Sequence, residues 1–384
     1  MNFLTRGIAN IILRSVAGRR TGPERVVNPA KFGIAVEDPV CLRRIREILT
    51  AFFSGFECGL KRPAELRRLE EAVDPLLRPF FHEGAAMGFV PHGYLGLTPW
   101  RKSLLRFEEA LGEGDPYVLM SYVGLGFWLG FQYSNAAPRL EARAAELRQT
   151  KYRHLLHDGY GFKVGFFDFP RLEPRDLARL EREIGELELD AEDSLDRGNV
   201  ELASEFRRQQ LKVESSLRID GLRSLTNFGR ASAFNGLGRS LWFFTMDRPA
   251  HGFALARFLG PDRDAVIGGM GLAAAFTFVD DLSRAYRVAE GLSGREQDHF
   301  VKGIRIALYV RDRGDPEYLS GCTDRLPPDL RSRVEADLSR AVQVGKSTQA
   351  LENFIEMFHE GCLQESTATD EEVGKGKGME EIRP

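Results

Sequence analysis

Residues 53–60 read Phe-Ser-Gly-Phe-Glu-Cys-Gly-Leu, and residues 234–241 read Phe-Asn-Gly-Leu-Gly-Arg-Ser-Leu. Both segments have a phenylalanine, a glycine two positions later, an apolar residue directly after it, and a leucine at the eighth position. Glycines inside apolar runs usually let two helices, or a helix and a ligand, approach closely. The two segments therefore predict tight packing of helices at two related places in the fold.

Two further landmarks follow each segment at similar spacing. A Met-Gly pair begins 32 residues after Gly55 and 34 residues after Gly236, and another glycine follows that methionine by 37 and 33 residues. Ordered landmarks at matched spacing indicate an internal repeat. We therefore predict two homologous halves in which three pairs of positions superpose, namely Gly55 with Gly236, Met87 with Met270, and Gly124 with Gly303.

Apolar residues recur every three or four positions, which is the helical period, and alternation with a period of two is nearly absent. We therefore predict a mainly α protein, an internally duplicated helical domain with an inserted charged helical hairpin. The predicted divisions are a basic amphipathic N-terminal segment (1–30), a first helical half (31–171), the charged hairpin (172–222), a second helical half (223–315), C-terminal helices (316–365) and a disordered tail (366–384).

The predicted hairpin turns near Gly198-Asn199, with an apolar stripe on each side of the turn. It resembles the UVR motif, a short helical hairpin that makes protein–protein contacts, and a generic charged hairpin is the alternative. Under the first interpretation its partners are other biosynthetic proteins.

The composition is that of an ordinary globular protein. The 384 residues are 43% hydrophobic, and 53 Lys and Arg against 56 Asp and Glu leave a net charge of −3. Because no overall basic field exists to neutralise phosphates, we do not expect nucleic-acid binding. The four cysteines are scattered singly, which predicts neither a disulfide framework nor a zinc site and favours a cytoplasmic location.

Two apolar stretches, 119–131 and 265–279, are shorter than the roughly 20 residues that a transmembrane helix needs, so we predict buried core helices and no transmembrane segment. Residues 1–20 are basic and apolar, but arginines interrupt them before a secretory core of full length forms. They are predicted to dock on the protein itself or to make peripheral membrane contact.

Four polar residues are candidate catalytic groups because each lies among apolar, aromatic or small residues. Glu83 and Arg239 are charges in such surroundings, and Asp158 and Tyr160 lie in a segment rich in glycine and aromatic residues. A buried charge is costly unless it is paired or held with a shifted pKa for chemistry. The alternatives are structural, with Glu83 paired to Arg239 and Asp158 capping a helix.

Apolar and aromatic residues next to these groups are the candidate substrate-binding side chains. We predict that Glu83, Asp158, Tyr160, Arg239 and Trp242 converge on one cavity between the halves. The predicted substrate contacts are Phe81, Met87, Phe162, Trp242 and Met270.

Asp280 and Asp281 follow an aromatic-rich helix and offer a second interpretation. Class I isoprenoid cyclases use such acids to hold Mg²⁺ and a diphosphate in an all-helical fold with aromatic walls. The third acid of that motif is missing here, and an N-cap of the helix over 282–289 is the structural alternative. No other metal site and no other cofactor is indicated.

Five ordered motifs resemble those of a bacterial family of unknown biochemical function, the enediyne biosynthesis proteins (DUF1702), over roughly residues 30–315. The motifs are Phe53-x-Gly-Phe, Phe81-His-Glu-Gly-Ala-Ala-Met-Gly, Val123-Gly-Leu-Gly-Phe, Asp158-Gly-Tyr-Gly-Phe and Gly236-Leu-Gly-Arg-Ser-Leu-Trp-Phe. The resemblance implies a role in natural-product biosynthesis and assigns no catalytic residue.

The sequence thus favours an enzyme that acts on an apolar polyene or polyketide-derived intermediate in a cavity between two helical halves. The rival hypotheses are an isoprenoid cyclase that uses Asp280 and Asp281, and a non-enzymatic helical carrier or scaffold for a biosynthetic complex. Buried acids with shifted pKa values favour the enzyme, and mutually paired charges in a continuous apolar cavity favour the carrier.

Overall fold

The computed structural model describes residues 28–95, 100–111, 115–133, 137–197, 199–225 and 227–347, and these ranges are mostly helical without a strand. The mainly α prediction is confirmed for them. The predictions for the N-terminal segment up to residue 27, for the end of the C-terminal helices and for the tail fall on residues outside these ranges.

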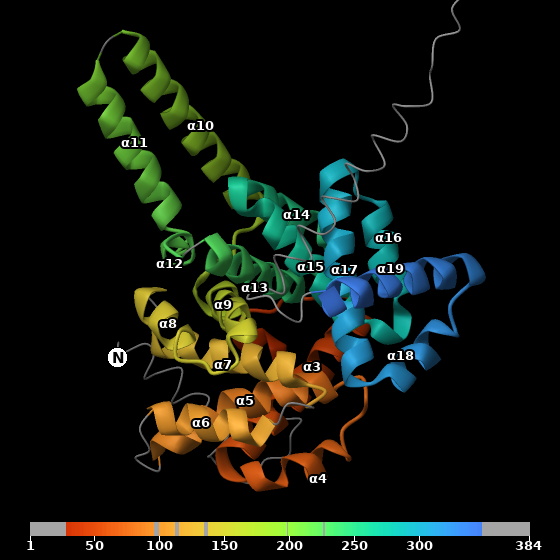
Figure 1. The fold of residues 1–384 in the computed structure, drawn as a ribbon. Helices are drawn as coiled ribbons and strands as arrows, with labels where there is room; N and C mark the ends of the chain where they lie inside the picture. The colour runs from red at the N-terminus through yellow and green to blue at the C-terminus, as the bar shows by residue number, and fades with distance from the viewer. Residues whose placement is uncertain are drawn as a thin grey trace, which may run out of the picture.

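Seven helices form a series in which each packs against the next (Figure 1). They are α3 (Pro39–Lys61), α5 (Arg78–Leu95), α7 (Val118–Gln132), α9 (Arg153–Lys163), α13 (Asn227–Thr245), α15 (Arg263–Thr277) and α17 (Gly294–Gly314).

Further helices connect, cover or extend from this series, and α19 (Pro328–Ser347) packs on α17. The others are α4 (Leu66–Glu70), α6 (Trp100–Leu111), α8 (Ala137–Ala144), α10 (Pro174–Asp196), α11 (Val200–Ser215), α12 (Asp220–Arg223), α14 (Pro249–Phe258), α16 (Ser283–Glu290) and α18 (Pro316–Thr323).

Capping residues fix several helix starts. Asp38 accepts a hydrogen bond from the Cys41 amide at 2.7 Å, with Pro39 as the first residue of α3. Asp315 does the same for the Tyr318 amide at 3.0 Å at the start of α18. Proline suits the first turn because its missing N–H would have no partner there.

Glycines bring the seven helices unusually close at all six junctions. A Cβ atom on one or more glycines at each junction would lie 1.7–2.2 Å from a backbone carbonyl oxygen of the neighbouring helix. No side chain fits such a gap, so these helices pack backbone against backbone. One such contact per junction is Gly55 to Phe81, Gly124 to Glu83, Gly159 to Val123, Gly236 to Asp158, Gly238 to Val266, and Gly303 to Gly268.

The two apolar stretches of the sequence form α7 and most of α15, and both helices are buried over nearly their whole length. This agrees with their prediction as core helices. Among the described helices, none combines the length and the apolar character that crossing a bilayer requires.

Helices α10 and α11 lie side by side and extend away from the other helices (Figure 1). The turn residue Asn199 accepts a hydrogen bond from the Leu202 amide at 3.1 Å, which caps α11. Leu189, Val200 and Leu202 toward the far end are exposed, whereas Leu177 and Leu180 near the start of α10 are buried. The segment 172–222, predicted as a separate hairpin, therefore includes side chains that belong to the main core.

Replacing residues 184–210 with a short Gly-Ser linker is expected to leave the core folded, because the buried base of α10 is retained. We expect the thermal midpoint to change by no more than about 3 °C, or about 1 kcal/mol. Calorimetry measures the thermal midpoint of this variant and of a second variant that lacks residues 174–222. The longer deletion removes buried leucines, each worth about 2–5 kcal/mol. A non-cooperative transition in the shorter deletion would show that the distal part belongs to the core.

Candidate functional site

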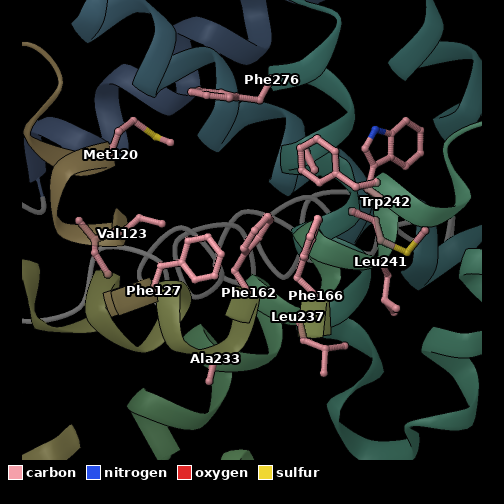
Figure 2. Close-up of a cluster of buried hydrophobic side chains, with 14 of the residues drawn as sticks. Met120, Val123, Phe127, Phe162, Phe166, Ala233, Leu237, Leu241, Trp242 and Phe276 are labelled. Carbon is pink, nitrogen blue, oxygen red and sulfur yellow. The ribbon is translucent and has the colours of Figure 1, made fainter. Parts of the chain in front are cut away.

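A partly open aromatic cavity lies among α3, α5, α7, α9 and α13; its volume is about 50 Å³, or about 580 Å³ when the open space at its mouth is counted. Figure 2 shows three of its rings, Phe127, Phe162 and Phe166, side by side in a row within a cluster of buried hydrophobic side chains. Ring centroids are 5.2 Å apart for Phe127 and Phe162, and 5.6 Å for Phe162 and Phe166. The apolar lining consists of Phe32, Ile48, Leu49, Phe52, Phe53, Phe80, Met87, Phe127, Phe162, Phe166, Phe167 and Phe243.

A π-helical turn over Val164–Asp168 shapes one wall of the cavity. It closes with the Phe169 amide donating to the Val164 carbonyl at 2.8 Å, an i to i+5 bond. Such wide turns alter the angle between successive side chains and occur often at functional sites. Here the turn places Phe166 and Phe167 on the cavity together with Phe162.

Glu83 and Arg239 are the two polar residues of the lining within the described part of the chain, and Arg239 also binds Asp158. The Arg239 Nη2 atom lies 3.4 Å from both carboxylate oxygens of Glu83, and Nη1 donates to Asp158 Oδ1. All three residues are buried, with 5% or less of their surface exposed. They come from α5, α9 and α13, so the ion triad, defined as Glu83, Asp158 and Arg239, joins three helices of the series.

Asp158 has a second partner in Asn235, one turn before Arg239 on α13. With its amide oriented so that the nitrogen faces the carboxylate, Asn235 donates to Asp158 Oδ2 at 3.0 Å. Arg239 and Asn235 thus satisfy both oxygens of Asp158, whereas Glu83 has the longer contact and faces the cavity.

The triad holds two carboxyl groups and one guanidinium, so it carries an excess negative charge when both acids are ionised. The pKa of Glu83 is raised to about 7. Burial is the largest cause and the neighbouring Asp158 adds to it, whereas Arg239 acts in the opposite direction. Burial also raises the pKa of Asp158, against the opposing effect of Arg239. Glu83 therefore exchanges its proton near neutral pH.

Glu83 is expected to make the folded protein less stable as pH rises. Its pKa is about 7 in the folded protein and 4.5 ordinarily, so the folded state holds the proton more tightly. Glu83 thereby contributes on the order of 3 kcal/mol to the free energy of unfolding. This contribution is fully present below about pH 4.5 and is lost as pH rises through about 7. Urea unfolding of wild type and Glu83→Gln between about pH 5 and 8 measures it. A stability difference between the two proteins that stays constant with pH would contradict the assignment.

The structure brings Glu83, Asp158 and Arg239 into contact, but of the three only Glu83 and Arg239 line the cavity, together with Met87 and Phe162. The other predicted residues lie elsewhere, because their helical positions point them at different neighbours. Trp242 packs on Phe300 of α17 with 6.3 Å between ring centroids. The Met270 methyl group lies beside Gly252 of α14. The ring centroid of Phe81 lies 6.0 Å from the ring centroid of the adjacent His82.

Tyr160 is also outside the cavity, since two positions along an α-helix place it on the side opposite Asp158. Its hydroxyl lies against Gly221 of α12, where a Cβ would be 2.7 Å away. Within the described ranges this buried hydroxyl has no hydrogen-bond partner. Burial, and to a lesser degree Asp168, raise its pKa to about 12. The predicted convergence of Tyr160 and Trp242 with the triad is therefore not what the structure has.

Asp280 and Asp281 are held by arginines at a separate place. Arg44 donates to Asp280 at 2.6 Å, and Arg284 donates to Asp281 at 3.1 Å. Asp281 also accepts from the Ser283 hydroxyl and bonds no backbone amide of α16, so the predicted N-cap is not formed. The described residues contain no cluster of three or more His, Cys, Asp or Glu side chains arranged to hold a metal.

Sequence reasoning missed Asn235 and most of the phenylalanines of the lining. The spacing of Asn235 and Arg239, four residues apart on a helix, was an available signal because it places both on one face. The phenylalanines carried no such signal, since the chain contains 27 of them and most fit a core equally well.

Residues 22–176 match the model of a family described as a protein of unknown function, DUF1702. The match includes Glu83 and Asp158 and ends before Arg239. No curated protein and no solved structure is similar to the chain.

Proposed function

We propose that the protein is an enzyme of specialised-metabolite biosynthesis, of the enediyne or polyketide type, that acts on an apolar polyene or polyketide-derived intermediate. The observation that carries this proposal is the cavity that, among the described residues, is lined by apolar side chains with only Glu83 and Arg239 as polar groups. Ligand sites in proteins commonly combine apolar walls with a few placed polar groups.

Glu83 is the group that performs proton transfer in this proposal. It faces the cavity, and its proton is labile near neutral pH because burial raises its pKa. Asp158 stays in contact with Arg239 and Asn235 and so fixes the guanidinium that faces Glu83. In this scheme Asp158 and Asn235 are positioning residues, and the phenyl rings exclude water.

The glycine contacts support the further proposal that α3, α5 and α7 are homologous to α13, α15 and α17. Three backbone approaches recur at matching places in the two sets, and they pair Gly55 with Gly238, not with Gly236 as the sequence pattern predicted. The matched approaches are Gly55 to Phe81 with Gly238 to Val266, Gly84 to Phe52 with Gly269 to Asn235, and Gly124 to Glu83 with Gly303 to Gly268.

This correspondence aligns Glu83 with Gly268, so the second set has no counterpart of the acid. Helix α9, which supplies Asp158, lies between the two sets. The proposed site therefore lies where the two proposed halves meet, and it occurs once and not in each half.

A carrier of the same ligand is the second candidate, because the charges of the triad are paired with one another. The cyclase hypothesis is not retained as a proposal, since arginines hold Asp280 and Asp281 away from this cavity.

The first experiment tests binding with 1,6-diphenylhexatriene, a neutral polyene whose fluorescence rises in apolar surroundings. We expect saturable binding to wild type, retained in Glu83→Gln and lost in Leu49→Trp, which fills the cavity. Leu189→Trp, on the exposed part of α10, is the matched control. Equal binding to Leu49→Trp and Leu189→Trp would show that the probe does not use the cavity.

The second experiment separates enzyme from carrier. The Glu83→Gln allele replaces the gene in its native host, and mass spectrometry identifies apolar molecules extracted from the purified proteins and from the cells. If the protein is an enzyme, the strain that carries Glu83→Gln is expected to accumulate an unconverted precursor. The same bound molecule and the same final metabolite in both strains would favour the carrier.

A further inference from the structure

We infer that the aromatic cavity selects a lipophilic cation, either as the bound ligand or as the charged species formed during the reaction. The inference rests on the proposed function, since it names the class of molecule that the same cavity takes. It follows from the charges, the rings and the small number of hydrogen-bond donors in the lining.

The charge count is the first observation. Two carboxylates and one guanidinium leave one negative charge on three residues that are almost fully buried. A buried unpaired charge is costly, so it is compensated either by a proton on Glu83 or by a cation in the cavity. An anionic ligand would add to the excess.

The second observation is that Glu83 is available to such a cation. Its contacts with Arg239 are 3.4 Å long, whereas strong charge-assisted N–H···O bonds measure about 2.7–2.9 Å. Asp158, by comparison, is held by both Arg239 and Asn235 and does not line the cavity.

The third observation is the ring surface. Nine phenylalanines line the cavity, and the faces of such rings attract cations. One example already exists within the site, because the guanidinium carbon of Arg239 lies 5.1 Å from the centroid of Phe162.

The lining also offers little to a neutral polar or anionic ligand. Among the described residues it contains no hydroxyl, amide or indole side chain, and its one cationic group already contacts two acids. A carboxylate would add to the negative charge, and a carbonyl could take a hydrogen bond only from Arg239 or from Glu83 when it holds a proton. The cavity therefore discriminates by positive charge and apolar shape.

The test uses two molecules of the same shape that differ in one atom, benzyltrimethylammonium and neopentylbenzene. Each competes with diphenylhexatriene on the full-length protein at about pH 8.5, where Glu83 is ionised. We expect the cation to bind about tenfold more tightly than the neutral molecule, and Glu83→Gln to abolish that ratio without changing the affinity for neopentylbenzene. Glu57→Gln, on the exposed side of α3, is the control and is expected to keep the ratio.

Lowering the pH to about 5.5 should reduce the ratio, because Glu83 then takes up a proton. The charged groups that face Glu83 are Arg239 of α13 and Asp158 of α9. Equal affinity for the two molecules in wild type, or a ratio that persists in Glu83→Gln, would overturn the cation inference while leaving the cavity proposal in place. Absence of diphenylhexatriene binding would overturn both.

A second pair of variants covers the case in which Glu83→Gln does not fold. Leu49→Lys adds an ammonium group at the cavity, and Leu49→Met is its uncharged counterpart. We expect the cation-to-neutral ratio to fall about tenfold in Leu49→Lys relative to Leu49→Met. An unchanged ratio in this pair would likewise refute the inference.

Discussion

Gly236→Ala is expected to destabilise the protein by about 3 kcal/mol or more, at the upper end of what overpacking costs. A Cβ at this position would lie 1.8 Å from the carbonyl oxygen of Asp158 and 2.7 Å from the amide nitrogen of Phe162. Both contacts are backbone, so no rotamer change relieves them. The helices α9 and α13 must separate, which pulls Arg239 away from Asp158. Urea unfolding measures the loss.

The matched control is Gly185→Ala, in the middle of the exposed helix α10. A Cβ there has no neighbour within 4 Å. Alanine is the better helix former, so this substitution is expected to stabilise the protein by up to about 1 kcal/mol. Equal behaviour of the two variants would mean that α9 and α13 do not approach as closely as described.

The helical class of the fold followed directly from the sequence, and so did the use of its glycines. Gly55 and Gly236 lie in apolar runs, where small residues predict close approach, and both contact a neighbouring backbone. The sequence did not show which neighbour each contacts. Gly55 faces the helix that follows it and Gly236 the one that precedes it, a difference that arises from tertiary packing and leaves no local signal.

The charged part of the site was predictable for a physical reason. Glu83 and Arg239 each stand among residues that bury them, and buried charges must find partners, so their meeting followed from the cost of leaving them alone. Tyr160 and Trp242 are also buried, but an uncharged side chain can lie against any apolar neighbour. The aromatic lining was not predictable, because apolar contacts carry no such demand for a specific partner.

Arg239→Met is expected to give the largest loss of stability among the charged positions discussed, about 3–5 kcal/mol near pH 7. Methionine retains the aliphatic stem but leaves Glu83 and Asp158 buried together without a cation. Arg239 lowers the pKa of both acids in wild type, so its removal raises both values further above those of the unfolded chain. The deficit of the variant should therefore shrink as pH falls and both acids take up protons.

Two comparisons make this expectation specific to a buried charge. Arg257→Met removes a guanidinium that is half exposed and paired with Glu296 at 2.6 Å, and should cost no more than about 1 kcal/mol. Adding Glu83→Gln and Asp158→Asn to Arg239→Met removes the unpaired acids and should recover most of the loss at pH 7. Unfolding free energies of these variants at about pH 5.5 and 7.5 decide the matter. A deficit that is independent of pH, or that persists in the triple variant, would mean that Arg239 stabilises the fold by packing and not by neutralising the two carboxylates.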